Sequence, residues 1–269
     1  MARGRWSFTW ILLVLALTAL LGHFWTPYDP LAPQPEIAFL PPSVQHLFGT
    51  DDLGRDVFSR VLAGTPYSLL TVAAVLSIAV TLGTLVGLVA GYAGGLVDEM
   101  LMRVTDIFLA FPVIILALAL TATFGPSYGN SLLAIGLVWW PGYARLVRGQ
   151  VLTLRERDYV EAAQALGAGT QRIIWRHILR NALTPVLVQL SLDTGNVLVT
   201  ASALSFIGLG AQPPTPEWGL LVSLSAQNVL TAWWQSTFPG LAIFCAALAL
   251  NAVGERLQST LAPRRQSLI

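Results

Sequence analysis

Residues 159–181 read YVEAAQALGAGTQRIIWRHILRN, and this charged passage lies between two of the long apolar stretches of the chain. Its alanines and leucines favour a helix, and its glutamate and arginines are costly inside a bilayer. A transmembrane helix needs about 20 mostly apolar residues, and the stretches on either side satisfy that requirement. The passage is therefore predicted to be a helical segment that stands outside the membrane, between two spans.

The composition of the whole chain points to the same class of protein. Of its 269 residues, 55% are hydrophobic and only 11% are charged, whereas a soluble domain carries about 25% charge. We therefore expect an all-α polytopic membrane protein. All fifteen basic residues are arginines, so the chain lacks the lysine that a Walker A loop requires, and any ATP must be bound by another chain. The one cysteine, Cys245, excludes an internal disulfide and a multi-cysteine metal site.

About six transmembrane helices are predicted. They cover residues 6–28, residues 67–97, two helices within 107–144, residues 181–208, and a sixth from about residue 237 to 254. The stretch 107–144 is too long for one crossing, and FGPSYGN at 124–130 supplies turn-forming residues that divide it. The first span resembles a signal peptide because Arg3 and Arg5 precede it, but no small-residue cleavage site follows, so a retained anchor helix is expected.

The arginines orient these helices. Thirteen of the fifteen lie before span one, between spans two and three, between spans four and five, or after span six, and these four regions share one side. The other two, Arg55 and Arg60, lie between spans one and two. Since arginine is enriched in cytoplasmic loops, both termini and residues 159–181 are predicted to be cytoplasmic, and the region between spans one and two is predicted to be external.

This predicted external region has two parts. The proline-rich TPYDPLAPQPEIAFLPP is typical of an extended surface linker, and FGTDDLGRDVFSR follows it. In the second part, Asp51, Asp52, Arg55 and Asp56 are predicted to form ion pairs in a short turn that precedes an amphipathic helix over about 55–65. A metal site built from the same carboxylates is the alternative, and the ion-paired external cap is favoured.

Three glycines of the second span, Gly83, Gly87 and Gly91, recur at every fourth residue. This spacing places them on one helix face and lets another backbone approach closely. Two interpretations fit the pattern: tight packing within this chain, or an interface with another subunit.

The helical passage carries its own start and stop signals. Asp158 is predicted to be the N-cap, and Glu161, three residues later, to complete a capping box. Gly167 and Gly169 end the helix or let another surface come close, and a second, basic helix follows from about residue 170. A short helical peg of this kind suits a groove on a partner protein. The alternative is an amphipathic helix that lies on the lipid surface.

The heptapeptide EAAQALG, residues 161–167, resembles the EAA motif of permease subunits of bacterial ABC importers, in which Glu-Ala-Ala is followed by three residues and Gly. Further stretches between about residues 48 and 258 resemble the dipeptide/oligopeptide/nickel permease family, and within it the C-type subunit. These stretches read FGTDDLGRDVFSR, GGLVDEMLMRVTDIFLAFP, WWPGYARLVRGQVL, ALSFIGLGAQPPTPEWG and FPGLAI.

The resemblance implies a type I ABC importer permease fold in the bacterial inner membrane and no catalytic residue in this chain. In that family the motif forms a coupling helix that docks on the ATP-hydrolysing subunit, and the resemblance assigns this role to Glu161, Ala162, Ala163, Gly167 and Gly169. The implied partners are a homologous B-type permease subunit, two ATP-binding subunits and an extracytoplasmic substrate-binding protein. ATP and Mg belong to the partner subunits, and no cofactor, metal or nucleic acid is expected on this chain.

The expected organisation has three regions. Residues 1–66 form an anchor helix and external segment, residues 67–258 the permease domain with the coupling helix near 159–169, and residues 259–269 a cytoplasmic tail. Small peptides are the expected cargo, and nickel or a nickel chelate is the alternative. The family usually has proline where this chain has Arg180, so the break before span five is expected to be displaced or softer.

Asp193 lies deep in a predicted span, where a charge costs roughly 2.5–3.5 kcal/mol on insertion scales. Helical geometry places Asn196 and Thr200 on the same face, and the three are predicted to line the translocation pathway. The alternative is a structural role in which Asp193 accepts hydrogen bonds from a neighbouring helix. An ion-coupled secondary transporter also places carboxylates in the membrane, and this function is the less favoured alternative because the chain shows no internal repeat.

Overall fold

The computed structural model describes residues 17–22 and 24–261 of the chain. Most of the predicted first span, residues 6–28, and most of the predicted tail, residues 259–269, lie outside these described residues.

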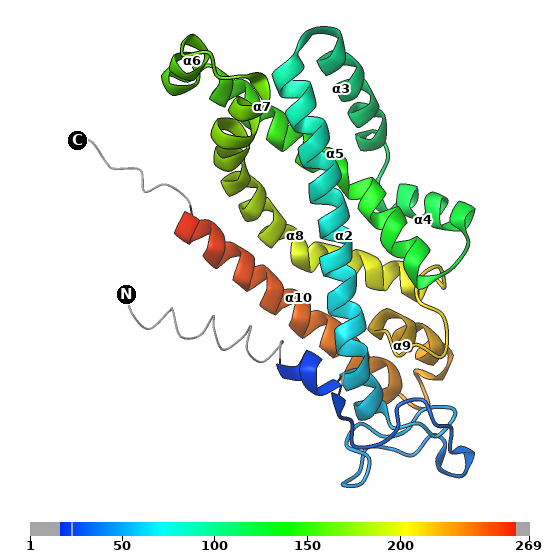
Figure 1. The fold of residues 1–269 in the computed structure, drawn as a ribbon. Helices are drawn as coiled ribbons and strands as arrows, with labels where there is room; N and C mark the ends of the chain where they lie inside the picture. The colour runs from blue at the N-terminus through cyan, green and yellow to red at the C-terminus, as the bar shows by residue number, and fades with distance from the viewer. Residues whose placement is uncertain (1–16, 23, 262–269) are drawn as a thin grey trace, which may run out of the picture.

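The described chain is mostly helical, as predicted (Figure 1). Its elements are η1 (Pro35–Ile37), α2 (Val57–Ala93), α3 (Gly95–Leu109), α4 (Val113–Phe124), α5 (Tyr128–Arg155), α6 (Asp158–Ala165), α7 (Thr170–Ile173), η2 (Ile174–Ile178), α8 (Leu179–Phe206), α9 (Trp218–Ser225), η3 (Ala226–Asn228) and α10 (Trp234–Leu261). Among the described residues, strand-type pairing is limited to one isolated bridge between Thr50 and Asp56.

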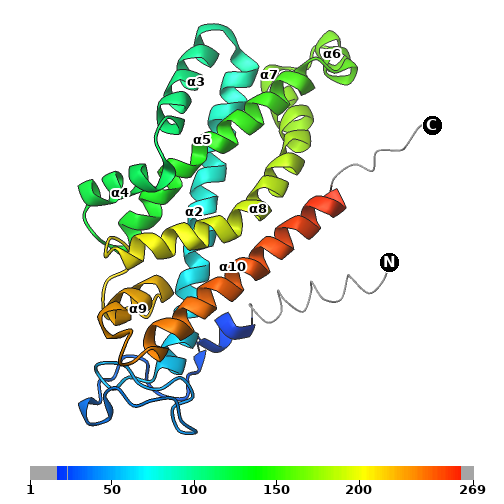
Figure 2. The same ribbon diagram turned by 180° about the vertical axis from the view of Figure 1, so that it is seen from behind.

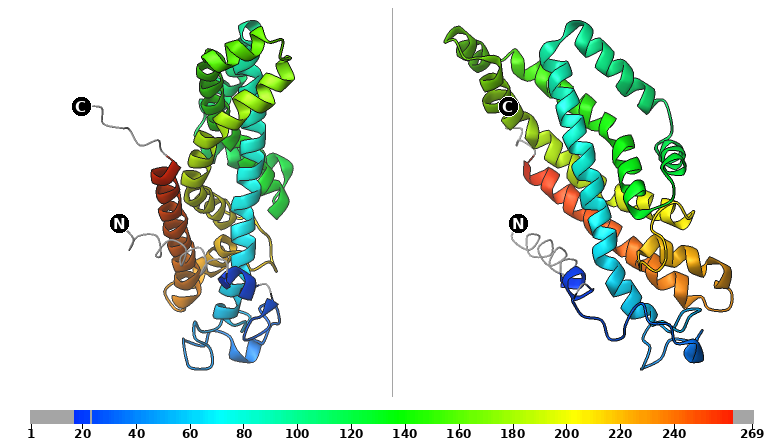
Figure 3. Two further views of the ribbon diagram at one scale, coloured as in Figure 1. Left: turned by 60° about the vertical axis from the view of Figure 1, so that its left-hand side comes forward. Right: turned by 45° about the vertical axis from the view of Figure 1, so that its right-hand side comes forward.

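Helix α2 is the long central helix of the molecule; α5 packs along it, and α8 and α10 cross it (Figures 1 and 2). The most extensive packing joins α2 to α5, followed by α8 to α10. In both Figure 1 and Figure 2, the loops before α2 lie at one end of the molecule and α6 lies at the other. Figure 3 shows that the bundle is elongated along α2 and narrower across it.

Three described helices are long and apolar enough to cross a membrane: Val57–Ala93, Thr170–Phe206 and Trp234–Thr260. A fourth span is added if α3 and α4 count as one broken span. Only 22–39% of the three apolar windows is buried inside the chain, so most of their surface is left for lipid or partner subunits. Helix α5, the predicted fourth span, has 28 residues but carries Arg145 and Arg148 in its second half and does not meet the same apolar criterion.

The third span is not the single helix that was predicted for the first part of 107–144. Helix α3 already begins at Gly95, and the chain bends by 93° between α3 and α4. Pro112 explains the bend, because proline disfavours a helical backbone at the preceding residue and stands here as the N-cap of α4. The predicted division near 124–130 is confirmed: α4 ends at Phe124 and α5 begins at Tyr128.

Two predicted helix boundaries are absent. The amphipathic helix expected over 55–65 is the first part of α2, which runs past residue 66 to Ala93 without interruption. The break before span five, expected to be displaced or softer because of Arg180, is missing as well, since one continuous helix extends from Thr170 to Phe206. Instead of a break, this helix contains the π-helical turn η2, in which the Leu179 N–H donates to the carbonyl of Ile174.

The three glycines of α2 pack against α5 of the same chain. A Cβ atom added at Gly83 would lie 2.6 Å from the Trp140 carbonyl oxygen, and one at Gly87 would lie 2.5 Å from that of Ala144. Side chains cannot occupy these positions unless the two backbones separate. Of the two interpretations of the glycine pattern, the structure supports packing within this chain.

Candidate functional site

Helix α6 and its two flanking turns, residues 156–169, are called the α6 hairpin here. The helix begins one residue earlier than predicted. Arg157 is the N-cap, with extended backbone angles, and its carbonyl accepts from the N–H groups of Val160 and Glu161. The predicted capping box is therefore wrong: Asp158 is the first helical residue, and no side chain caps the helix. Asp158 and Glu161 both lie in the first turn, where negative charge interacts favourably with the helix dipole.

The C-terminal end of α6 is a Schellman turn. The Gly167 N–H donates to Gln164 at 2.9 Å, and the Ala168 N–H donates to Ala163 at 3.0 Å, which is the pair of bonds that defines this motif. Gly167 has a φ of +80°, a conformation that costs an L-residue roughly 1–2 kcal/mol. Gly169 differs, because its φ is −66° and it is the N-cap of α7. The prediction that Gly167 ends the helix is confirmed.

The α6 hairpin is attached to the rest of the chain at its base. Val160 is fully buried in the main hydrophobic core. The Tyr159 ring lies 6.2 Å from that of His177, and the Asn181 amide donates to the Tyr159 hydroxyl at 3.3 Å. These contacts tie α6 to the helix Thr170–Phe206.

The remaining surface of α6 is left mostly exposed by the described chain. Glu161 and Ala162 are exposed, Ala163 is half-buried, and the side chain of Leu166 is 89% exposed. Atoms of the described chain leave the space around Gly167 open to at least 4 Å from an added Cβ. The helix projects from the end of the molecule (Figures 1 and 2). The exposed surface combines two alanines and one leucine with charged and polar side chains.

A cavity of about 470 Å³ lies between α5, α8 and the α3–α4 corner. Asp193 and Gln189 line it from α8, and Tyr143 lines it from α5. The Tyr143 hydroxyl donates to Asp193 Oδ2 at 2.8 Å, and the Gln189 amide donates to Oδ1 at 3.1 Å. The structural hydrogen bond between helices and the cavity lining are thus both present at Asp193.

The other two pathway candidates do not line this cavity. Asn196 is exposed, whereas Thr200 is 8% exposed and its hydroxyl donates to the Asn196 carbonyl at 2.8 Å. Helical periodicity places the three residues on one side of α8, but only packing against neighbouring helices decides which of them reaches a cavity.

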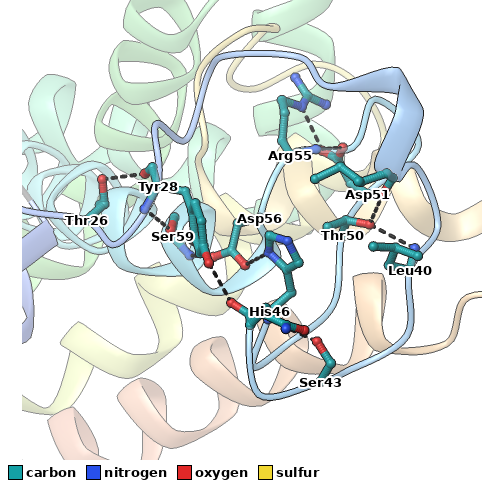
Figure 4. Close-up of polar contacts among 12 residues, drawn as sticks. Thr26, Tyr28, Leu40, Ser43, His46, Thr50, Asp51, Arg55, Asp56 and Ser59 are labelled. Atoms are coloured by element: carbon teal, nitrogen blue, oxygen red, sulfur yellow. Dashed lines mark hydrogen bonds and ion pairs between the residues drawn. The ribbon is translucent and has the colours of Figure 1, made fainter.

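At the opposite end of the molecule, residues 25–56 and the first turn of α2 form a compact unit, here called the cap (Figure 4). The predicted ion pairs are present: Arg55 Nε donates to Asp51 Oδ2 at 2.7 Å, and Arg55 Nη2 lies 3.6 Å from Asp52. Arg60 adds a second cation 3.2 Å from Asp51, although the angle falls short of a hydrogen bond and Arg60 Nε has no partner among the described residues.

Asp56 takes part in a separate set of contacts that sequence reasoning missed. Its carboxylate accepts from the Ser59 N–H at 2.7 Å and so caps α2, and it lies 2.9 Å from His46 Nδ1 (Figure 4). Asp56 and Asp51 therefore face different partners and do not share a metal-ligand arrangement. Sequence spacing gave no signal for His46, because the turn that brings it to Asp56 is irregular.

The cap is also bonded to the start of α10. The Thr50 carbonyl accepts from the Trp234 indole N–H at 3.1 Å and from the Gln235 amide at 3.2 Å. Gly49, with a φ of +72°, leaves no space for a side chain because an added Cβ would lie 2.7 Å from Trp234 Nε1. These contacts join the loops before α2 to the last helix of the chain.

Glu217, in the segment between α8 and α9, is buried beside the first half of α2. Its carboxylate accepts from the Leu220 N–H at 2.9 Å and from the Ser68 hydroxyl at 3.4 Å. Burial raises the pKa of Glu217, and the backbone N–H groups of Gly219 and Leu220 oppose that shift. The residue caps α9 and fixes this segment against α2.

Comparison with known proteins adds sequence and fold relatives. The family described as binding-protein-dependent transport system inner membrane component matches residues 83–267. The probable D,D-dipeptide transport system permease protein DdpC of Escherichia coli (strain K12) is 44% identical over 255 residues, which cover 94% of this chain and 86% of that protein. The nickel transport system permease protein NikC of the same strain is 40% identical over 263 residues, covering 97% and 95%.

Among solved structures, an inward-facing MetNI methionine ABC transporter in its native CY5 crystal form matches with a TM-score of 0.59. The match covers 75% of this chain and 95% of that one at 14% sequence identity. At that identity the likeness shows the fold alone.

Proposed function

The chain belongs to the family of inner membrane components of binding-protein-dependent transport systems, and from this premise we propose that it is a permease subunit of an ATP-driven ABC importer for di- or oligopeptides. It forms the translocation pathway with a homologous B-type subunit and catalyses no reaction itself. The observation that carries the proposal is the exposed α6 hairpin, attached only at its base, on a chain that lacks a Walker A lysine.

In this proposal α6 docks on an ATP-binding subunit in the cytoplasm. Glu161, Ala162 and Ala163 present a narrow face, and Gly167 sharply ends the helix so that Leu166 can enter a groove. A helix lying on lipid would need a broad apolar face. Val160 instead faces the protein core, and the exposed residues of α6 include Asp158, Glu161 and Gln164 beside two alanines. No broad apolar face is left for lipid, which favours a protein partner.

The mechanism is alternating access driven from the cytoplasmic end. Two ATP-binding subunits, which hold ATP and Mg, close and displace α6. Helix α6 follows α5 directly and is bonded to the helix Thr170–Phe206 through Tyr159 and Asn181. A displacement of α6 therefore moves two helices that line the cavity around Asp193. The cap then lies outside, at the face where an extracytoplasmic binding protein delivers cargo.

Peptide cargo is supported by the similarity to DdpC and by the chemistry of the cavity. Asp193 offers a carboxylate that can attract the ammonium group of a peptide. Nickel or a nickel chelate is the second candidate because NikC is 40% identical to this chain. Nickel in proteins is well matched by imidazole ligands, and the described lining of the cavity includes neither histidine nor cysteine. Ligand identification on the cognate binding protein distinguishes the two cargoes.

The proposal is tested by purifying the tagged full-length chain from membranes. We expect a homologous permease and ATP-binding subunits to co-purify, and we expect the complex in proteoliposomes to import cargo only with ATP on the side of α6. A secondary transporter would instead co-purify without ATP-binding subunits and would import cargo in response to an ion gradient alone. That outcome would overturn the proposed function.

A further inference from the structure

Three arginines follow the α6 hairpin, and we call Arg172, Arg176 and Arg180 the arginine row. The proposed coupling assigns no role to them. Arg172, Arg176 and Arg180 are exposed and line an open groove of about 480 Å³ together with Gln171 and Trp175. Among the residues that the structure describes, no carboxylate lies within ion-pair distance of this arginine row. The row is therefore a concentrated positive patch without a counterion in the described chain.

Three other arginines expected on the same side of the membrane are paired with carboxylates. Arg103 contacts Glu99, Arg145 lies 2.7 Å from Asp106, and Arg148 contacts Asp98. Arg155 and Arg157 have no carboxylate within ion-pair distance among the described residues, so the arginine row is distinguished by the groove that its three members share.

The π-helical turn explains why the three arginines line up. In an α-helix with 3.6 residues per turn, side chains four positions apart drift around the axis by about 40° at each step. The turn Ile174–Ile178, closed by the bond from Leu179 to Ile174, lies between Arg172 and Arg180 and is wound more widely. The drift is thereby reduced, and the arginine row stays on one face. The opposite face carries Ile173 and Ile178, which are buried.

The row ends where the uncharged part of the helix begins. The helix is continuous from Thr170 to Phe206, and after Arg180 the next charged residue is Asp193. At about 1.5 Å per residue, the row extends for roughly 12 Å, which is long enough to span the interfacial layer, about 5–8 Å thick on each side of the hydrocarbon core. Trp175 is 62% exposed, and tryptophan is typical of the membrane–water interface.

We propose that Arg172, Arg176 and Arg180, together with Trp175, bind the headgroup phosphate of an anionic phospholipid in the cytoplasmic leaflet. Guanidinium groups match phosphate oxygens in a forked, bidentate geometry. The indole ring of Trp175 lies beside the glycerol backbone, and the lipid fixes the depth of the helix that carries α6. An acidic surface of a partner protein is the competing occupant. It is disfavoured because α6 projects past this row and the row continues into the membrane span.

The test uses the complete transporter complex, purified in mild detergent and mixed with equal amounts of phosphatidylglycerol and phosphatidylcholine. Native mass spectrometry measures which lipid stays bound. The wild type is expected to retain phosphatidylglycerol preferentially. Arg172→Gln with Arg176→Gln should reduce that preference about tenfold or more, since each basic residue near an anionic lipid surface contributes about a fivefold factor. Inorganic phosphate in excess should not displace the lipid, because it lacks the glycerol and acyl groups that contact Trp175.

The matched control is Arg103→Gln with Arg145→Gln, which removes the same charge from arginines that have carboxylate partners. It should keep the lipid preference. If the glutamine pair in the arginine row prevents folding, Arg172→Lys with Arg176→Lys keeps the charge, loses the fork, and should retain part of the preference. The proposal is overturned if the wild type binds both lipids equally, if the control loses as much preference, or if inorganic phosphate releases the lipid. It is also overturned if the glutamine pair keeps phosphatidylglycerol and instead loses the ATP-binding subunits.

Discussion

The cap and the α6 hairpin lie at opposite ends of the α2–α5 pair, and they treat their polar groups in opposite ways (Figures 1 and 4). In the cap, Asp51, Arg55, Asp56 and Arg60 are buried and have charged or hydrogen-bonding partners in the same chain. On the hairpin, Glu161 and Ala162 are exposed and Val160 is buried. The polar groups of the cap thus find partners in their own chain, whereas the exposed surface of the hairpin is free for the partner protein that we propose.

The largest expected effect is a loss of stability caused by a substitution in the cap. Asp51→Ala leaves Arg55 and Arg60 buried without their shared carboxylate, which should lower the free energy of unfolding by about 3–5 kcal/mol. Asp52→Ala is the control. The Asp52 side chain is 48% exposed and lies 3.6 Å from Arg55, so its loss should cost at most about 1 kcal/mol. Denaturant unfolding in detergent measures both variants. Equal losses would mean that burial does not distinguish these ion pairs.

The next largest effect concerns the α6 hairpin, where a substitution should weaken binding of the partner subunit and leave the fold intact. Gly167→Asp places a charge at the end of the docking face, and we expect it to weaken binding of the ATP-binding subunit roughly a hundredfold, about 3 kcal/mol. The protein should remain inserted in the membrane. Gly167→Asn is the matched control, because asparagine tolerates the positive φ and carries no charge. Co-purification at graded subunit concentrations gives the affinity, and full binding by Gly167→Asp would refute the docking role.

A smaller effect concerns the link between the two ends. Gly87→Ala would place a Cβ 2.5 Å from the Ala144 carbonyl oxygen, and the separation of α2 from α5 should cost about 1–3 kcal/mol of stability. Gly142→Ala, on α5, meets no atom of the described chain within 4 Å and should be close to neutral. Thermal unfolding in detergent compares the two. A neutral Gly87→Ala would show that the two helices are not held at closest approach.

The smallest effect on stability is expected at Asp193. Its oxygens accept hydrogen bonds within the chain, as in the cap, yet the residue also lines a cavity. Asp193→Asn retains an acceptor for Tyr143, so the loss of stability should stay within about 1 kcal/mol. Import of cationic peptides should fall more than import of neutral ones, because the carboxylate charge is gone. Competitive uptake of the two peptide classes measures this. An unchanged ratio would assign Asp193 a structural role only.

Local chemistry made parts of this fold predictable from the sequence. The length of the uncharged apolar stretches predicted α2, α8 and α10. Gly167 predicted the end of α6, and the spacing of Asp51 and Arg55 predicted their ion pair. Each of these depends on neighbours in the chain.

Features set by long-range packing were not predictable. The contact of His46 with Asp56 depends on an irregular loop, and the bonds from Trp234 to Thr50 join residues far apart in the chain. Whether Thr200 faces a cavity depends on its neighbouring helices. The π-helical turn at Ile174–Ile178 lies in the region where a displaced or softer break was expected, and the helix continues through Pro185, so the residue type at one position did not decide whether the helix is interrupted.

The central claim is that α6 contacts an ATP-binding subunit and the cap does not, and site-directed crosslinking in the assembled complex tests it most directly. Cys245→Ser first removes the native thiol, and a single cysteine with a photoactivatable maleimide is then placed at Leu166 or at Val44. These positions are matched, since their side chains are 89% and 93% exposed at opposite ends of the molecule. The account predicts a crosslink to the ATP-binding subunit from residue 166 and none from residue 44. A crosslink to that subunit from residue 44, with none from residue 166, would contradict it.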